Sequence, residues 1–327
     1  MSSSPTDTRV RYSDAINRGL ADALEADPRV VLMGIDVGAG GGIFTVTRGL
    51  HERYGAARVL DTPISEMGYV GAAVGAAMTG LRPIVEIMFM DFIGVCLDPI
   101  MNQAAKVQYM SDGAWEVPIV FRTQTGAGRA AGAQHSQSLE AMLAHIPGLK
   151  VVLPATVTDA HDLLVAAVED PNPVVYVENR RLYGMRGELD QDPLPLGRAR
   201  VAAAGDDVTV VTWGQMVREC LTAAGAADAS VEVVDLRSLV PLDMDTVLAS
   251  AARTGRVLVV HEAVQDFGAG AELAARIGEE LFDVLRTPVK RIGAPSVPMP
   301  FSPSLEQALL PQAAAVAAAC DQLVREG

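Results

Sequence analysis

Residues 61–80 read DTPISEMGYVGAAVGAAMTG, and this stretch predicts a helix whose surface is made of small residues. Pro63 disfavours helical backbone in the residue before it. Ser65 suits the N-cap position, so we expect the helix to begin at Glu66. Each glycine in a helix interior costs about 1 kcal/mol against alanine. The repeated glycines therefore indicate that another backbone packs closely here, and we expect it to come from a second subunit.

Apolar runs that suit β-strands alternate with alanine-rich stretches on both sides of this helix. They cover residues 30–35, 83–90, 117–121, 150–155 and 173–178, and then 207–213, 231–236 and 256–263. Strands that are apolar on both faces and alternate with helices are typical of parallel sheets covered by helices. The predicted fold class is α/β, with two tandem domains of mainly parallel sheets. We expect a final helix over residues 305–324.

A polar segment rich in proline and glycine separates the two series of strands. Between Tyr183 and Arg200 the chain reads YGMRGELDQDPLPLGRAR, which has the composition of a linker. We therefore predict a first domain at residues 1–185, a linker at 186–200 and a second domain at 201–327.

The composition narrows the choice of partners and compartment. The chain has 327 residues, with 26 Lys and Arg against 40 Asp and Glu and a net charge of −14, so we expect neither a nucleic acid nor a membrane as partner. Cys96, Cys220 and Cys320 are odd in number and widely spaced, which argues against a disulfide framework and suits a reducing compartment. The sequence shows no signal peptide or apolar span, so we expect a cytoplasmic protein.

Two residues are candidates for chemistry, and each has a purely structural alternative. Glu66 either favours the helix N-terminus electrostatically or shares a proton with a ligand nitrogen inside an apolar enclosure. In residues 126–141, GAGRAAGAQHSQSLEA, His135 lies among amides and a hydroxyl, which suits acid–base work or a structural histidine. This stretch also fits G-x-G-x-x-A, but the acidic ribose partner of a dinucleotide site is missing. Signatures of P-loops, serine hydrolases and zincins are absent.

Several long segments, taken in order, resemble the β subunits of thiamine-diphosphate-dependent 2-oxo acid dehydrogenases, the E1 family. They are DTPISEMGYVGAAVGAAMTGLRP, RTQTGAGRAAGAQHSQSLEA, HIPGLKVV, VVDLRSLVPLD and VLVVHEA. The resemblance extends from about Tyr12 to Val324. The segment MFMDFIGVC at 88–96, the glycine insert after Asp36 and RTQTGAGRAAGAQHSQSLEA at 122–141 look most like β subunits of the acetoin dehydrogenase type.

The resemblance implies a pyrimidine-binding domain followed by a transketolase C-terminal-type domain. It makes Glu66 the carboxylate that contacts N1′ of the aminopyrimidine of thiamine diphosphate, where a shared proton favours the imino tautomer that deprotonates the thiazolium. Ile64, Met88 and Phe92 would line the pyrimidine ring, and His135 would lie near the reacting carbon. Branched-chain-type members carry Gln where this chain has Met88, which counts against that substrate class.

The resemblance also bears on metal ions. Some family members bind a structural monovalent cation such as K⁺, for which Asp170 and Asn172 are side-chain candidates here; the backbone candidates are Ile119, Ala167 and Val168. Thiamine-diphosphate enzymes hold Mg²⁺ through a G-D-G motif followed by Asn. The nearest string here, at residues 205–207, lacks the last glycine, and no Asn occurs after Asn179. This chain therefore carries half a cofactor site, and an E1 α subunit that holds the Mg²⁺ would supply the rest in an α₂β₂ assembly.

The sequence thus predicts the β subunit of a heteromeric E1 component. It would decarboxylate a 2-oxo acid or cleave acetoin, and pass the acyl unit to a lipoyl-bearing E2. Two alternatives stay open: a two-chain transketolase-like carboligase that works without lipoyl, and a noncatalytic β-like scaffold. The sequence does not separate acetoin, pyruvate and longer oxo acids as substrates.

Overall fold

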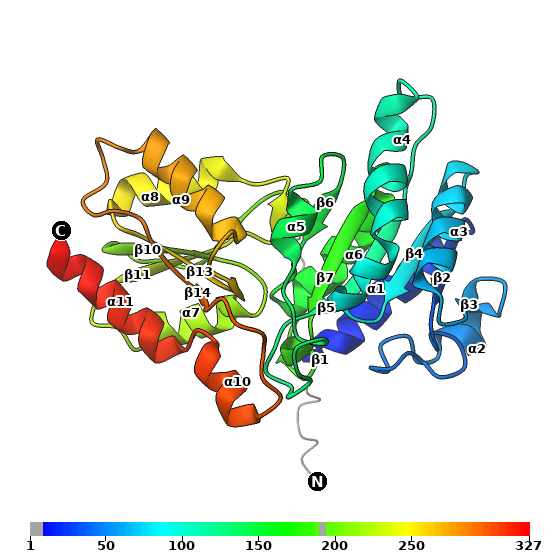
Figure 1. Cartoon of the computed structure of the whole chain (residues 1–327), viewed down its shortest axis with the longest axis horizontal. Helices are drawn as coiled ribbons and strands as arrows, with labels where there is room; N and C mark the ends of the chain where they lie inside the picture. The colour runs from blue at the N-terminus through cyan, green and yellow to red at the C-terminus, as the bar shows by residue number, and fades with distance from the viewer. Residues whose placement is uncertain (1–8, 190–193) are drawn as a thin grey trace, which may run out of the picture.

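The computed structural model describes residues 9–189 and 194–327. It places two mainly parallel sheets side by side, each covered by helices (Figure 1). The predicted α/β class with two tandem domains is confirmed. Among the described residues, no helix is long and apolar enough to cross a membrane.

The first sheet has seven strands in the order β12-β6-β7-β5-β4-β2-β3. Their bounds are β2 Val30–Gly34, β3 Val59–Asp61, β4 Arg82–Ile87, β5 Val120–Thr125, β6 Lys150–Val152, β7 Val174–Asn179 and β12 Ser238–Val240. All neighbours are parallel except β12, which pairs antiparallel with β6 although it comes from the second half of the chain. Because the carboxyl ends of parallel strands meet at one edge, the segments after β4, β5 and β7 are brought together there.

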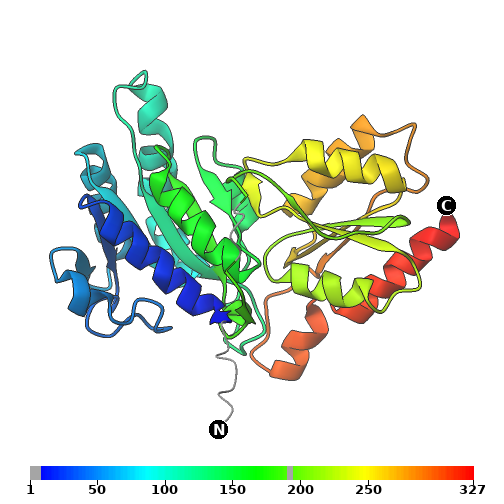
Figure 2. The same ribbon diagram turned by 180° about the vertical axis from the view of Figure 1, so that it is seen from behind.

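Helices cover both faces of the first sheet. The helices α1 (Tyr12–Ala26) and α6 (Val157–Glu169) lie side by side on one face (Figure 2). The other face is covered by α3 (Glu66–Met78), the 3₁₀ helix η1 (Met90–Cys96), the π-helical turn η2 (Pro99–Ala104), α4 (Ala105–Met110) and α5 (Glu140–Ala144). Smaller elements complete this half: α2 (Leu50–Tyr54), η3 (Arg180–Leu182), and the antiparallel pair β1 (Val10–Arg11) and β8 (Arg186–Gly187).

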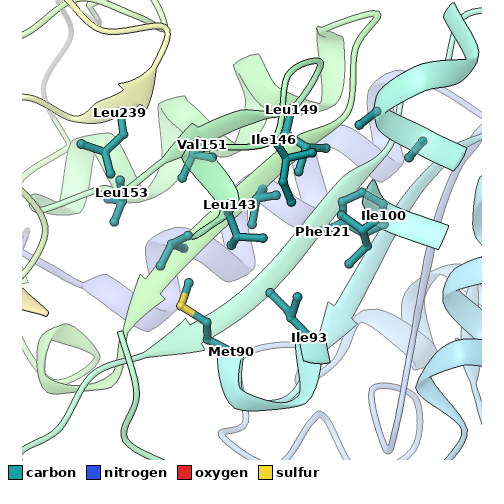
Figure 3. Close-up of a cluster of buried hydrophobic side chains, with 14 of the residues drawn as sticks. Met90, Ile93, Ile100, Phe121, Leu143, Ile146, Leu149, Val151, Leu153 and Leu239 are labelled. Carbon is teal, nitrogen blue, oxygen red and sulfur yellow. The ribbon is translucent and has the colours of Figure 1, made fainter. Parts of the chain in front are cut away.

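Successive strand residues enter two different cores, which explains why the strands read as continuous apolar runs. In β5, Val120 packs in the cluster beneath α1 and α6, whereas Phe121 packs in the cluster on the opposite face. Figure 3 shows part of this second cluster, where Phe121 and Met90 meet residues of the segment that includes α5 and β6. The same cluster includes Leu239 and continues into the second domain, so the two domains share a hydrophobic core.

The second sheet has five strands in the order β14-β13-β10-β11-β9, of which only β9 is antiparallel to its neighbour. Their bounds are β9 Arg200–Ala203, β10 Val208–Thr212, β11 Val231–Asp235, β13 Val257–Val264 and β14 Lys290–Ala294. One face packs against α7 (Met216–Ala224) and α11 (Ala313–Glu326), and the other against α8 (Met244–Thr254) and α9 (Ala269–Glu280).

The final helix and the linker were both predicted from the sequence with particular bounds. The expected final helix is instead two helices, α10 (Pro303–Leu309) and α11, because Pro311 lies between them and lacks the N–H that a continuous helix needs. The predicted linker at 186–200 includes residues 190–193, which lie outside the described part of the chain. At its two ends, Arg186 and Gly187 pair with β1, and Arg200 begins β9.

Candidate active site

Glu66 begins α3 at the carboxyl edge of the first sheet. The carbonyl oxygen of Ser65 accepts hydrogen bonds from the backbone N–H groups of Gly68 and Tyr69, which starts the helix there. The Glu66 side chain is only 9% exposed. Among the described residues, none donates a hydrogen bond to its carboxylate, and the Ser65 side chain makes no capping bond. A nearly buried carboxylate at a positive helix end, with no protein donor, is available to a ligand.

The groups beside Glu66 do not compete for that role. Burial, together with the charge of Glu66, raises the pKa of the Cys96 thiol to about 12. Burial and Glu66 also raise the pKa of Tyr69, whose hydroxyl donates to the backbone oxygen of Glu86 at 3.2 Å. Both groups therefore stay protonated at neutral pH, and the acid–base role of Glu66 stays a prediction.

His135 lies against two aromatic rings from the segment after β4. Its ring is 4.8 Å from Phe89 and 5.5 Å from Phe92, both in edge-to-face geometry, and the two phenyl rings are themselves 5.4 Å apart. Nearby, the side-chain amide of Gln137 donates to Asp91 Oδ1 at 2.8 Å. The structure thus brings two predicted site residues, Phe92 and His135, into contact.

The other two predicted ring-lining residues differ in exposure. Ile64, two residues before Glu66, is 83% exposed. Met88 follows β4, is half-buried and packs against the hydrophobic cluster of this face. An exposed isoleucine beside a nearly buried carboxylate suits a site that a ligand or another chain covers. The roles of Ile64, Met88 and Phe92 toward a pyrimidine stay predictions.

Two of the residues proposed for a monovalent cation, Asp170 and Val168, already contact cationic side chains. Asp170 pairs with Lys150 and accepts hydrogen bonds from the backbone and side chain of Asn172 at 2.9 and 3.0 Å. The backbone oxygen of Val168 accepts from Arg82 at 2.6 Å, and that of Ile119 accepts from the Val174 N–H. Because Lys150 and Arg82 already contact these oxygens, the residues fit a further cation poorly. The cation site, formed by Ile119, Ala167, Val168, Asp170 and Asn172, stays a prediction.

The described residues offer no group of three or more His, Cys, Asp and Glu placed to hold a metal ion. The string at 205–207 forms protein contacts instead. Asp206 pairs with Arg253 at 2.6 Å, and Asp207 accepts from the backbone of Ser230 at 2.8 Å. The assignment of Mg²⁺ to a partner chain stays a prediction.

Sequence reasoning missed two buried residues that hold the loop carrying His135. Arg180 donates to the backbone oxygens of Gly126 and His135, and its guanidinium lies 4.9 Å from the centre of the Phe89 ring. Glu262, at the carboxyl end of β13, accepts a hydrogen bond from the backbone of Ala127 at 2.6 Å. Their positions at the ends of strands were the available signal, because polar residues there reach the edge where loops gather.

Comparisons of sequence and of fold relate this chain to known proteins. The model of the transketolase pyrimidine-binding domain matches residues 8–186, and that of the transketolase C-terminal domain matches residues 197–316. The subunit beta of acetoin:2,6-dichlorophenolindophenol oxidoreductase from Cupriavidus necator is 44% identical, over 96% of this chain and 97% of that protein. The mitochondrial pyruvate dehydrogenase E1 component subunit beta-1 of Arabidopsis thaliana is 45% identical, over 91% and 85%.

Among solved structures, a split gene transketolase in an inactive beta4 tetramer aligns with a TM-score of 0.80. The alignment covers 97% of this chain and 99% of that chain at 24% identity, and therefore supports the fold alone.

Proposed function

The chain belongs to the E1 β subunits of thiamine-diphosphate-dependent dehydrogenases, with transketolase-type domains, and we propose that it forms half of the active site of such an enzyme. In this proposal the complex decarboxylates a 2-oxo acid or cleaves acetoin, and transfers the acyl unit to a lipoyl-bearing E2. The observation that carries the proposal is the Glu66 carboxylate, nearly buried at the start of α3 and without a donor among the described residues.

Glu66 fits the aminopyrimidine of thiamine diphosphate. A carboxylate that protein donors do not satisfy can take a proton shared with a ring nitrogen, and its placement at a helix N-terminus fixes its direction. Phe92 and Met88 offer apolar surface on the next segment of this sheet edge. Bound thiamine diphosphate would supply a carbon nucleophile and an electron sink for cleavage of the C–C bond.

His135 would handle protons on the other side of the reacting carbon. Phe89 and Phe92 hold its ring edge-on, and neither offers it a hydrogen bond through a polar atom. Among the residues that the structure describes, none hydrogen-bonds to its two ring nitrogens, so these can donate to or accept from a substrate oxygen or an incoming lipoyl group. In this proposal Glu66 acts on the cofactor ring and His135 acts on the substrate.

The rest of the cofactor site would come from an E1 α subunit in an α₂β₂ assembly, which would also hold the Mg²⁺. The glycine face of α3 supports this part of the proposal. A Cβ atom added at Gly71 or Gly75 would meet nothing within 4 Å in this chain, so the face is open to another backbone. The exposed side chains of Ile64 and Met67 lie at the N-terminal end of the same helix.

In this proposal, residues of both subunits line the substrate pocket and determine which substrate of this class is accepted. The two relatives described above have nearly the same identity to this chain, so identity does not favour acetoin over pyruvate. Met88 stands where branched-chain-type members carry Gln, which counts against that substrate class and leaves acetoin and pyruvate as candidates.

Copurification from the native host tests the proposal. The tagged chain is purified gently, and mass spectrometry identifies the copurifying polypeptides and any released thiamine diphosphate. We expect a second chain with a G-D-G…Asn motif, a lipoyl-bearing protein, and cofactor only in the complex. Turnover without E2 or lipoamide would favour the carboligase, and recovery of the chain without cofactor or partner would favour the scaffold.

A further inference from the structure

The loop that carries His135 crosses the junction between the two domains. It follows β5, and a cavity of about 330 Å³ lies between this loop and the second domain, lined by Ser136, Ser138, Glu262 and Val297 among others. Close packing with the second domain is therefore interrupted at this cavity, although Gly132 of the loop approaches Phe301. The position of the loop depends on hydrogen bonds from outside the loop.

Glu262 supplies the hydrogen bond that comes from the second domain at the start of the loop. Its Oε1 accepts from the backbone N–H of Ala127 at 2.6 Å, and its Oε2 accepts from the side-chain amide of Asn179 at 2.8 Å. The approach is close: a Cβ atom at Gly126, which has φ +94°, would lie 2.7 Å from Oε1. Only glycine at position 126 permits this contact together with that backbone conformation.

The charge of Glu262 carries a cost in stability. Burial raises its pKa to about 7, nearby Glu140 raises it too, and Arg181 with the two hydrogen bonds lowers it. The neutral form would be the easier one to bury. However, only the ionised carboxylate, which predominates above pH about 7, presents two full acceptors to the two donors. A costly charge retained where it orders a loop is expected at a functional site rather than at a purely structural one.

We propose that Glu262 is a positioning residue for His135: through Ala127 it lets the second domain set the geometry of the loop from Gly126 to Gln137. Two further residues hold the loop. Arg180 donates to the backbone oxygens of Gly126 and His135 at the two ends of the loop segment, and Glu306 of the second domain accepts from the backbone N–H of Ala130 at 2.9 Å. The part of this inference that concerns catalysis rests on the proposed function. The part that concerns the loop does not.

The test compares E262Q with the matched control E232Q. The substitution at 262 keeps the size of the side chain but points an amide N–H₂ at one of the two donors. Glu232 is also buried in the second sheet, on β11, and pairs with Arg253. In the full chain, hydrogen exchange of the amides in 126–137 should be about tenfold faster in E262Q, and unchanged in E232Q. The melting temperature of E262Q at pH 8 should be equal to or above that of the wild type.

In the complete enzyme complex, E262Q should lower kcat about tenfold and leave the KM for thiamine diphosphate unchanged, whereas E232Q should lower neither. Loop exchange and kcat that both match the wild type would overturn the proposal. So would a fall in melting temperature with faster exchange throughout the second domain, because that is the result of a structural role. If the wild-type complex lacks the proposed activity, the proposed function fails, while the exchange result still decides the role of Glu262 in the loop.

Discussion

Two carboxylates of this chain, Glu66 and Glu262, lie at the edges of its two sheets in opposite environments. Glu66 has no donor among the described residues, and exposed side chains and an open glycine face surround it. Glu262 is as nearly buried as Glu66, but it lies between the domains and accepts two hydrogen bonds from the first domain. The difference indicates a division of labour: the chain is open where a ligand and a partner would complete it, and closed where it positions its own loop.

The largest expected effect tests the open side. Glu66→Gln keeps the shape of the side chain but removes the acceptor that shares a proton with the cofactor ring. We expect activity of the complex to fall about a thousandfold, within the usual range for loss of an acid–base group, while the complex still assembles. Steady-state lipoamide reduction measures this loss.

Glu272→Gln is the control for that variant, because Glu272 also occupies the first turn of a helix, α9, and is exposed. It should leave activity unchanged. Full activity in Glu66→Gln would remove Glu66 from the chemistry and end the contrast between the two carboxylates.

The second prediction concerns the closed side and pH. The folded chain holds a proton on Glu262 up to a pKa of about 7, against 4.5 for an ordinary glutamate, so folding takes up a proton between these values. The contribution of this proton to the free energy of unfolding is complete below pH about 4.5. It is lost as pH rises through about 7, which lowers the free energy of unfolding by about 3 kcal/mol. Glu262→Gln has no such proton, so its melting temperature should fall less between pH 5 and pH 8. If the melting temperatures of the wild type and of Glu262→Gln change equally with pH, burial does not raise the pKa of Glu262.

Asp235, whose pKa burial also raises to about 7, contributes in the same direction in both chains. The comparison of wild type with Glu262→Gln therefore isolates the glutamate.

The third prediction concerns the role of His135 in acyl transfer. His135→Ala removes the imidazole that lies between the loop and the rings of Phe89 and Phe92. We expect acyl transfer to lipoamide to fall about a hundredfold, which corresponds to about 2.7 kcal/mol, with little change in melting temperature. His145→Ala, an exposed histidine just after α5, is the matched control. Matched melting curves together with unimpaired lipoamide reduction would exclude a catalytic role for His135.

The smallest effect concerns the open face of α3. Gly75→Ala should stabilise the isolated chain by up to about 1 kcal/mol, because alanine is the better helix former and the space at this position is open. Gly75→Leu should leave the isolated chain folded but lower the yield of copurified partner. The two variants at one position separate helix propensity from contact with a second chain. Undiminished recovery of the partner with Gly75→Leu would place the interface elsewhere.

Much of the fold follows from local pattern. The strands β2, β4, β7, β10, β11 and β13 lie where the apolar runs predict them, because burial on both faces requires consecutive apolar residues. The start of α3 at Glu66, with Ser65 at the N-cap position, was also predicted, although the Ser65 side chain makes no capping bond. The boundary at Pro311 was missed, although proline was a visible local signal for the end of α10.

Other features have no local signal. β12 joins the first sheet from the second half of the chain, next to β6, and a three-residue strand has too little pattern to reveal its partner. Arg122 pairs with Glu86 and Glu178 inside the first sheet, at 2.6 and 2.7 Å, where sequence reasoning expected apolar strand. These buried charges compensate one another only because three strands align them.

The sequence by itself determined the fold class, the family and the candidate chemistry of Glu66 and His135, because these depend on local spacing and on long segments that match in order. Only the tertiary structure decided that His135 lies against Phe89 and Phe92, and that Glu262 reaches Ala127, 135 residues earlier in the chain. The physical reason is that a hydrogen bond between distant segments requires both to be placed within a few tenths of an ångström. The packing of two sheets and their shared core sets that placement, and no single stretch of sequence contains it.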